Sequence, residues 1–470
     1  MITLGDEDET EASKFVDAII DAEPNRLDKI FRRRLFERTR GHPLFTAELL
    51  RDMQELGALQ KDDNGKWVTG PGLDWDTLPA RTEGVIEERI NRLDDNLQEI
   101  LTVASIQGEE FTAQLILPLV DADERQLLAA LTRELGKVHR LVVEEGTGRI
   151  GRNRLSHFRF RHQMFQKYFY EQLGTGEREL LHEKTALALE SVYEGNTDQV
   201  ALQLAIHYER AGLLENAARY YLKAGRNAER VYAYQEAAAL AAMGIACLDQ
   251  DSAGPPESRL RLELMLLMGD AQLHSGHIRE SMETYRTTAE LAQKLGAPEP
   301  AARAAMGYSE PCWNYNMVDS TCVRLVSEAL TLLGTSDSAL RASLIAHLAR
   351  ISKNLKPTEE WLGMLEEAIA MARRLDDPDT LIDCARVRFS LDRDPAHIGD
   401  RLALANEMVS LAQEAKNRHM LMELLMFRTF EQLALGNLAA CDWDLDTYQR
   451  LAKELADPRN LYFAATMRVS

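Results

Sequence analysis

The sequence predicts a mainly α-helical chain whose larger part is a solenoid of stacked, antiparallel helix pairs. The first observation is a repeat: segments 292–298, 372–378 and 452–458 are near copies, and Pro298, Pro378 and Pro458 are evenly spaced along the chain. Degraded copies at 332–338 and 412–418 halve this spacing, which gives a period of about 40 residues. Such a repeat indicates helix pairs, none of which can bury its apolar face alone. Such surfaces bind partners, so recognition is a more promising function than catalysis.

The second observation is that only helical patterns follow Glu177. Turns between paired helices are visible at Gly212, Gly276 and Gly436, each before a new apolar stripe. Alanines at 217, 218, 224 and 228 permit close contact between helices, and the clearest break is a Gly-Pro-Pro step within 251–257. We therefore place the first helical repeats at 176–250 and superhelical repeats at 251–470.

The composition is that of a folded protein with several units. At 470 residues the chain is too long for one core, and about three units are expected. Its net charge of −20 opposes non-specific nucleic-acid binding by the chain as a whole. The five cysteines show no CxxC pairing, which is typical of reduced, buried thiols in the cytosol. The acidic N-terminus and the short apolar runs predict a cytoplasmic protein without a membrane span.

Residues 11–59 show three helical patterns. The third helix carries its apolar residues within 44–53 and opens at Gly41-His42-Pro43. Proline suits the first turn of a helix because it has no amide hydrogen to leave unpaired. Residues 62–68, with an Asn-Gly step, predict a short hairpin, and a linker continues to Pro79.

Residues 83–135 predict four short helices, because apolar residues recur there at helical spacing. Apolar runs at 141–143 and 155–160 then flank a glycine-containing loop over 144–153, which predicts a β-hairpin. A helix rich in aromatic residues follows at 162–173. Helices followed by a hairpin are the order of a winged helix.

The sequence lacks the motifs of common catalytic sites. No GxxxxGK[ST] phosphate loop, GxSxG or HExxH occurs. His274 and His277 flank a Ser-Gly turn, which favours a solvated turn over a metal site. Acidic pairs fall at predicted helix ends or turns, where carboxylates suit the positive helix N-terminus or keep the surface soluble. We therefore expect no catalytic residues, no metal site and no enzymatic activity of this chain by itself.

One basic stretch, residues 137–167, holds eight Lys and Arg against two Glu. A basic wing would contact a DNA backbone. In a chain of this net charge, an intramolecular face or one that meets a nucleotide phosphate is favoured, and nucleic acid is not an expected partner. His162 follows Arg161 at the start of the predicted helix, and by spacing alone it is a capping or core residue rather than a ligand contact.

Four segments, taken in order, point to a family. They are GHPLFTAELL at 41–50, LP at 78–79 with VIEERI at 85–90, ASIQGEEF at 104–111 and FRHQMF at 160–165. Together they resemble the STAND class of signal-transducing ATPases, in particular the MalT-like bacterial regulators and their relatives fused to cyclase or transcriptional-activator modules. The resemblance covers residues 1–250 most closely and the later repeats only generically. It implies an NTPase core, a helical lid, a winged helix and a TPR-like repeat sensor, in that order.

The resemblance also implies nucleotide-contacting residues. In related plant-resistance and apoptosome proteins, the proline of a Gly-x-Pro step packs on adenine, which implies this role for Pro43, with Gly41 and Leu44 beside it. Residues 161–165 are similar to the winged-helix motif whose histidine contacts the β-phosphate of ADP, which implies this role for His162. Gln163 stands where many relatives have Asp, so the helix-start role of that position stays open. ADP or ATP would bind only together with an NTPase core.

The phosphate-loop, Mg²⁺-binding and sensor segments of that family would precede the lid, and this chain begins where they would end. Residues 2–4 resemble the tail of the last core strand, and the final residues resemble part of another repeat helix. We therefore expect a fragment of a longer regulator, or a truncated relative, that cannot hydrolyse ATP alone. ATP turnover that is abolished by changing Pro43 or His162 would contradict this.

These expectations divide the chain into a helical lid (1–60), a hairpin and linker (61–80), a winged helix (81–175), first TPR-like repeats (176–250) and superhelical repeats (251–470). They predict the regulatory part of a STAND-type switch: the repeats bind a small-molecule inducer or a protein partner. The lid and winged helix help to lock ADP in the off state of an NTPase core. The alternative is a stand-alone TPR-like scaffold without a nucleotide role, and a third hypothesis is DNA binding through the basic wing.

Overall fold

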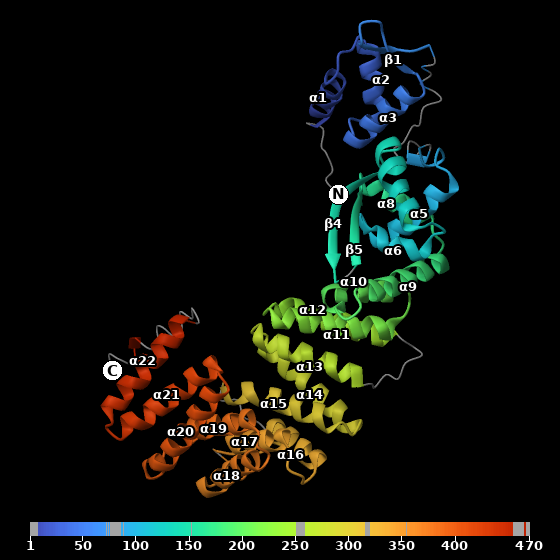
Figure 1. Cartoon of the computed structure of the whole chain (residues 1–470). Coiled ribbons are helices and arrows are strands. Elements are labelled where there is room, and N and C mark those ends of the chain that lie inside the picture. Colours follow the sequence, from blue (N-terminus) through green and yellow to red (C-terminus); the bar gives the residue numbers. More distant parts are fainter. Residues whose placement is uncertain are drawn as a thin grey trace. The chain divides into compact units, whose positions relative to one another are not determined.

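The computed structural model describes residues 8–71, 73, 75, 86, 87, 89–151, 153–250, 259–314, 320–353, 355–454, 465 and 466. Helices dominate these residues, as the sequence predicts (Figure 1). Contacts divide the chain into two compact units, residues 1–200 with 210–212 and residues 201–209 with 213–470. The expected strand tail at 2–4, the end of the linker at 76–79, the break at 251–257 and Pro458 lie outside the described residues.

The first unit begins with three helices and a hairpin. They are α1 (Asp8–Asp21), α2 (Lys29–Thr39), α3 (Pro43–Glu55) and the antiparallel strands β1 (Leu59–Lys61) and β2 (Trp67–Thr69). Helix α2 begins where the Asp28 side chain accepts a hydrogen bond from the amide of Phe31. In the hairpin, Gly65 has a φ of 74°, as an Asn-Gly turn requires. One apolar core joins the helices: Val16, Ile20, Phe31, Leu35, Phe45, Leu49 and Met53. The three predicted helices and the hairpin are confirmed.

The rest of the first unit packs helices against a three-stranded antiparallel sheet of order β3-β5-β4. Its elements are α5 (Asp95–Gln107), β3 (Glu110–Thr112), α6 (Ala113–Ile116), the 3₁₀ turn η1 (Leu117–Leu119), α7 (Glu124–Ala129), the π-helix η2 (Ala130–Val138), β4 (Val142–Ile150), β5 (Asn153–Phe160), α8 (Gln163–Gln172), α9 (Thr175–Val192) and the 3₁₀ turn η3 (Thr197–Val200). Residues 86, 87, 89 and 90 are also helical. The sequence therefore predicts the helices here but not strand β3.

The β4–β5 hairpin is longer than the sequence predicts. In place of a loop over 144–153, the strands pair as far as Arg149 with Arg154 and Ile150 with Asn153. Gly146 has a φ of 138° and sits at a shift of register, so it forms a bulge within the strand. The glycines of this segment mark a bulge and a tight turn rather than a long loop.

The second unit consists of helices in antiparallel pairs, and no strand occurs among its described residues. They are α10 (Ala201–Arg210), α11 (Leu214–Arg230), α12 (Tyr234–Gln250), α13 (Arg259–His274), α14 (Ile278–Lys294), α15 (Pro298–Asn314), α16 (Ser320–Leu333), α17 (Ala339–Ser352), α18 (Thr358–Arg374), α19 (Pro378–Leu391), the 3₁₀ turn η4 (Pro395–His397), α20 (Ile398–Glu414), α21 (Arg418–Ala434) and α22 (Leu438–Glu454). Each helix from α11 to α18 packs on the next, and α11, α13, α15, α17 and α19 also contact one another in turn. These odd-numbered helices therefore form one row of a TPR-like solenoid, which confirms the mainly α fold class.

The repeated alanines of the sequence mark helix C-termini. Ala292, Ala372 and Ala412 are buried, and their carbonyls accept hydrogen bonds from the amides five residues later, at 2.9, 3.3 and 3.1 Å. The residues just before those amides adopt left-handed backbone conformations: Gly296, Asp376 and Lys416. This Schellman geometry ends a helix in a sharp turn. The repeat is thus a capping signal that includes a buried alanine.

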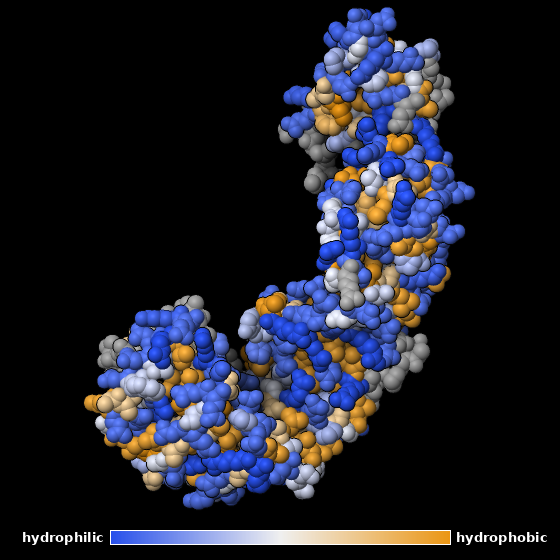
Figure 2. Space-filling view, viewed as in Figure 1, coloured by the Kyte–Doolittle hydropathy of each residue, from blue (hydrophilic) through white to orange (hydrophobic). Residues whose placement is uncertain are grey.

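The surface and the cysteines follow the expected pattern. All five cysteines are buried and none forms a disulfide. On the face shown in Figure 2, hydrophobic side chains are interspersed with hydrophilic ones. Within the described ranges, no helix combines the length and apolarity needed to cross a bilayer.

Candidate functional site

The residues that the sequence singles out at 41–44 form the start of α3. A Cβ on Gly41 would lie 2.6 Å from the Cβ of Ala12 in α1, and Gly41 has a φ of 69°, so the position requires glycine. His42 caps the helix, since its Nδ1 accepts a hydrogen bond from the Phe45 amide at 3.3 Å. Pro43 occupies the first helical position and is exposed. Leu44 belongs to α3, but its side chain lies outside the described residues.

His162 precedes α8 at the N-cap position, is half-buried and makes no capping hydrogen bond. Burial lowers the pKa of its imidazole, and charges on neighbouring side chains act in both directions. Glu48 raises this pKa, and three guanidinium groups lower it: those of Arg161, Arg51 and Arg89. The imidazole is therefore neutral at neutral pH, and it lies within electrostatic reach of α3.

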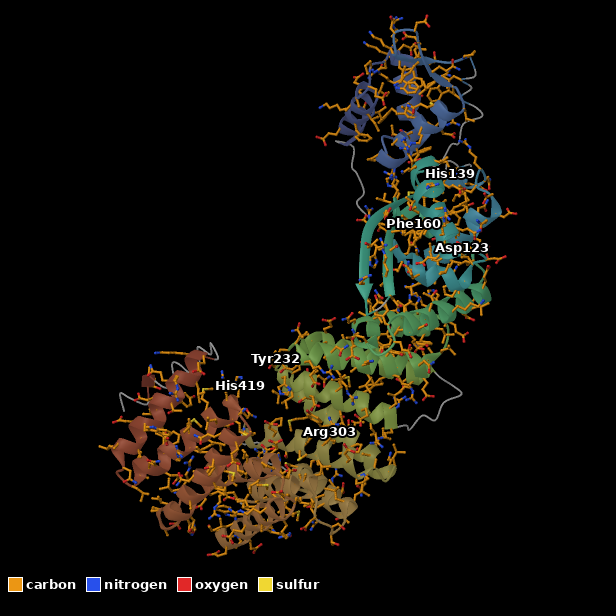
Figure 3. The ribbon with its side chains drawn as sticks, in the orientation of Figure 1. Asp123, His139, Phe160, Tyr232, Arg303 and His419 are labelled. Carbon is orange, nitrogen blue, oxygen red and sulfur yellow. The ribbon has the colours of Figure 1, made fainter. Side chains whose placement is uncertain are left out.

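A buried polar junction joins α3 to the sheet-containing part of the first unit. Glu48 and Arg89, 3% and 6% exposed, form an ion pair. Arg89 also donates to the carbonyl oxygen of His139, which Figure 3 labels, and its guanidinium lies 5.4 Å from the centre of the Phe165 ring. Buried charges are tolerated only when they are paired. This Glu48–Arg89 junction therefore fixes α3 close to α8 and to His162.

The basic stretch is partly neutralised within the chain. Arg159 pairs with Glu145 at 2.8 Å and with Glu109 at 3.8 Å. Arg149 and Arg154 lie directly opposite each other in the hairpin and are exposed. Arg152 lies outside the described residues. The positive charge that the sequence predicts is thus confined, among the described residues of the hairpin, to its tip.

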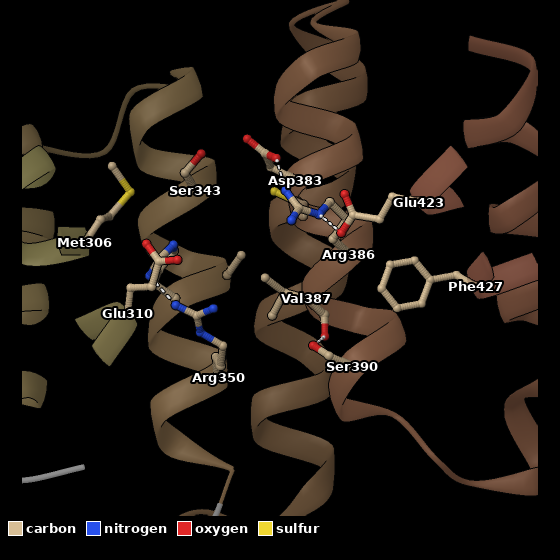
Figure 4. A pocket seen from close by; sticks show the side chains of 13 residues that line it. Met306, Glu310, Ser343, Arg350, Asp383, Arg386, Val387, Ser390, Glu423 and Phe427 are labelled. Carbon is tan, nitrogen blue, oxygen red and sulfur yellow. Dashed lines mark hydrogen bonds and ion pairs between the residues drawn. The ribbon is translucent and has the colours of Figure 1, made fainter. Parts of the chain in front are cut away.

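The second unit contains a cavity of about 470 Å³ on the row of odd-numbered helices (Figure 4). This volume falls within the range of about 300–1,000 Å³ that is usual for small-molecule sites. Helices α15, α17, α19 and α21 supply its walls. Its apolar side chains include Met306, Val387 and Phe427, and its charged ones are Glu310, Arg350, Asp383, Arg386 and Glu423.

The two arginines of the cavity differ in their partners. Arg386 pairs with Asp383 at 3.3 Å and with Glu423 at 2.9 Å, so it links α19 to α21. For Arg350, none of the carboxylates in the described part of the chain comes within ion-pair distance, and its Nε is buried without a hydrogen-bond partner. Burial lowers the pKa of this guanidinium. Of the two arginines in the cavity, Arg350 is therefore the one that the described part of the chain leaves without an ion pair.

His347 and Ser309 hold Arg350 in place. An Nη atom of Arg350 lies 3.1 Å from His347 Nδ1, and Ser309 Oγ lies 2.7 Å from the same nitrogen. Since a guanidinium only donates, Nδ1 must be unprotonated. The single hydroxyl hydrogen of Ser309 is shared between this nitrogen and the carbonyl oxygen of Met306, which lies 2.9 Å from Ser309 Oγ. Burial, with the charge of Arg350, lowers the pKa of His347 to about 3. A neutral imidazole thus orients the guanidinium without balancing its charge.

The sequence analysis missed this cavity, although the repeat contains a signal for it. Apart from Cys384, its lining residues fall into columns of equivalent repeat positions, in which each member lies one repeat period after the last. The columns are 306/346/386, 310/350/390, 343/383/423 and 347/387/427. Aligning the chain on its own period would have placed these side chains on one face of neighbouring helices. No cluster of His, Cys, Asp and Glu suited to a metal ion occurs in the described ranges.

No protein-family model matches the sequence, and no curated protein matches it. Among solved structures, the chain is similar to a STAND protein with a tetratricopeptide repeat sensor from Pyrococcus horikoshii, with 13% identity and a TM-score of 0.38 over 96% of this chain and 67% of that one. It is also similar to the apo quorum sensor NprR from B. thuringiensis, with 14% identity and a TM-score of 0.40 over 90% and 97% of the two chains. A Rap protein complexed with competence and sporulation factor matches with 12% identity and a TM-score of 0.38, over 61% and 78%. At TM-scores below 0.5, none of these similarities bears on the ligand or the activity of this chain.

Proposed function

We propose that this chain is the recognition and regulatory part of a signalling switch, in which the helical repeats bind a small-molecule inducer or a protein partner. The observation that carries this proposal is the cavity on the odd-numbered helices, where charged and apolar side chains of four helices converge. A structural solenoid has no need of an unbalanced, half-buried arginine at such a position. The proposal gives the chain no catalytic step of its own.

We further propose that the first unit acts as a latch for ADP bound to an NTPase core. Three features support this part: an exposed proline at the start of α3, a neutral histidine at the start of α8, and the guanidinium groups of Arg51, Arg89 and Arg161 near that histidine. A neutral imidazole can donate a hydrogen bond to a phosphate oxygen, and the guanidinium groups favour an anion there. The Glu48–Arg89 junction would keep the proline and histidine elements in one arrangement.

The two parts would be coupled by a shift of population between an off and an on form. A signal that binds the on form more tightly than the off form moves this equilibrium by the difference in binding free energy, typically about 1–3 kcal/mol. The chain would therefore respond to a signal only to the extent that the cavity differs between the two forms.

A screen of metabolites by thermal shift tests the recognition function. Val387 lies at the centre of the cavity wall, so Val387→Trp fills the cavity, while Thr287→Trp on the exposed face of α14 is the matched control. We expect compounds that raise the melting midpoint of the wild type and of the control but not of Val387→Trp. Compounds that stabilise all three proteins equally would place recognition elsewhere.

The latch is tested separately, with the chain joined to an NTPase core. His162→Ala should speed the release of ADP and raise basal signalling, since it removes the proposed phosphate contact. An unchanged rate of nucleotide exchange would contradict the latch. In that case, partner binding that survives deletion of residues 1–175 would favour the stand-alone scaffold.

A further inference from the structure

Ion pairs connect successive odd-numbered helices, both before the cavity and within its wall. Arg226 of α11 pairs with Glu263 of α13 at 2.6 Å, and Arg303 of α15, labelled in Figure 3, lies 3.7 Å from Glu263 and 3.8 Å from Asp270. In the wall of the cavity itself, Arg386 of α19 pairs with Glu423 of α21. A ladder of arginine–carboxylate contacts therefore runs along this row.

The ladder is interrupted at α17. One column of the repeat, in which each member lies one period after the last, consists of Glu263, Arg303, Ser343, Asp383 and Glu423, and only the α17 residue is uncharged. Arg350, the charged cavity residue of α17, has no carboxylate at ion-pair distance within the described chain. The cavity thus coincides with the one helix, within the described repeats, whose residue in this column carries no charge.

Glu310 is the carboxylate whose charge acts on Arg350, but it does not form an ion pair with Arg350. It occupies the position one repeat before Arg350, on α15, and its charge raises the pKa of the Arg350 guanidinium. Figure 4 shows both side chains on the same side of the cavity, with Val387 next to them and Phe427 on the far side. Glu310 is exposed, so an incoming anion can reach Arg350 without displacing a buried pair.

The balance of charges selects the kind of anion. Two arginines and three carboxylates line the cavity, and His347 is neutral because its pKa lies at about 3. The carboxylates of Glu310, Asp383 and Glu423 would repel an anion with two charges more strongly than one with a single charge. A ligand with one carboxylate can pair with Arg350, the one guanidinium of the cavity that forms no ion pair within the described residues. The apolar side chains of Met306, Val387 and Phe427 leave room beside it for an apolar body.

We propose that the cavity binds a ligand with a single carboxylate on an apolar body, and that Arg350 anchors this carboxylate. Two sources share this chemistry, a small organic acid and the C-terminus of a hydrophobic peptide. The inference rests on the proposed recognition function and specifies its ligand class. Ser309 and His347 position the Arg350 side chain, and the ligand carboxylate supplies the ion pair that Arg350 lacks within the described chain.

Isothermal titration of the full chain with matched probes tests the inference. The first pair of probes is octanoate and octanamide, and the second is an N-acetylated hydrophobic tetrapeptide with a free C-terminus and its C-terminal amide. We expect the carboxylate of at least one pair to bind at least tenfold more tightly than its amide. A preference confined to the first pair identifies a small acid, and one confined to the second identifies a peptide terminus.

Arg350→Met should reduce the affinity for the preferred carboxylate at least tenfold and leave the amide unchanged, while Arg350→Lys retains part of the preference. Arg373→Gln on α18, a half-exposed arginine outside the cavity, is the control and should bind as the wild type does. Because an unpaired buried charge costs stability, Arg350→Met should melt at or above the wild-type midpoint.

The inference is overturned if neither pair shows a carboxylate preference, if Arg350→Met retains it, or if Arg350→Met unfolds the repeats. The recognition function can be told apart from it. A library compound that loses binding to Val387→Trp but keeps binding to Arg350→Met leaves recognition standing and removes Arg350 as anchor.

Discussion

Individual residues of the second unit bury charge in two contrasting ways. Arg401, 3% exposed, contacts Asp392 at 3.4 Å and Glu431 at 2.9 Å. Arg350, in contrast, has only a neutral histidine as its side-chain partner within the described chain. The first arrangement stabilises the irregular connection between α19 and α20, and the second leaves a charge for a ligand to balance. Ion pairing, rather than burial alone, distinguishes Arg401 from Arg350, the proposed ligand anchor.

Removing Arg401 should be costly. Arg401→Met leaves the carboxylates of Asp392 and Glu431 buried without their principal cation, so we expect a loss of about 3–5 kcal/mol from the free energy of unfolding. Arg418→Met is the control, because Arg418 pairs with Glu454 at 3.4 Å in an exposed position, where about 1 kcal/mol or less is at stake. Urea unfolding followed by circular dichroism measures both, and equal losses would contradict the network's role.

His347 should make stability fall as the pH falls. Its pKa is about 3 in the folded chain, against 6.5 for the unperturbed side chain. Below pH 6.5 His347 is protonated in the unfolded chain but stays neutral in the folded chain. The free energy of unfolding therefore falls by up to about 1.4 kcal/mol per pH unit. His347→Gln keeps an acceptor for Ser309 and Arg350 but does not titrate. Thermal midpoints should therefore agree near pH 8 and diverge in favour of the variant near pH 5, and parallel curves would contradict the buried neutral imidazole.

Helices of the array pack closely where glycine leaves room for an aromatic ring. Tyr285 of α14 is 1% exposed, and a Cβ on Gly269 of α13 or Gly307 of α15 would come within 2.8 or 2.4 Å of its ring. The Tyr285 hydroxyl donates to Asp270 at 2.5 Å, so the ring is fixed at both ends. Three consecutive helices are thus joined around one side chain.

Gly307→Ala should destabilise this packing, although alanine is the better helix former. The added methyl meets the Tyr285 ring, and overpacking of this kind costs about 1–3 kcal/mol. Gly363→Ala in α18 is the matched control: nothing lies within 4 Å of its Cβ, so the propensity gain of about 0.5–1 kcal/mol should appear undiminished. Unfolding midpoints should move in opposite directions. If both variants gained stability, the close contact at Tyr285 would be contradicted.

The sequence predicts those elements whose boundaries have a local physical cause. Helix ends at Gly212, Gly276 and Gly436 were predictable because each glycine adopts a left-handed conformation that other residues rarely take. Strand β3 is only three residues long, too short for its alternation to stand out, and the bulge at Gly146 breaks the alternation of β4. Both therefore lay beyond a pattern-based prediction, since long-range pairing decides them.

For the candidate residues, too, local features could be predicted from the sequence and long-range contacts could not. Gly41, Pro43 and His162 were placed correctly at helix starts, since capping depends on neighbours in sequence. Their role toward a nucleotide stays a prediction. The pKa of His162 depends on the charges of Glu48 and Arg89, which come from distant segments, so no local sequence pattern predicts it. Arg350 was missed because its lack of a carboxylate partner among the described residues is a property of the folded chain alone.

The molecule as a whole comprises two units with separate cores. Leu101 belongs to a core formed by residues 86–169, and Leu365 to one formed by residues 342–452. Both side chains are fully buried. Each unit thus has apolar packing of its own, and stability need not be shared between them.

Heat should unfold the two units in distinguishable steps. Leu101→Ala and Leu365→Ala each remove a buried side chain at a cost of about 2–5 kcal/mol. Differential scanning calorimetry should show that each substitution lowers the midpoint of one transition and leaves the other in place. One cooperative peak that both substitutions shift would contradict independent units.

The alanine and left-handed caps of the solenoid have a consequence for how such a chain grows. The pairs that end at Ala292, Ala372 and Ala412 share this cap, so a duplicated or deleted pair of that kind finds compatible neighbours on both sides. The array can lengthen or shorten by whole pairs while its interior stays intact. A new specificity then needs only one altered column member in one pair, which leaves every other joint as it was.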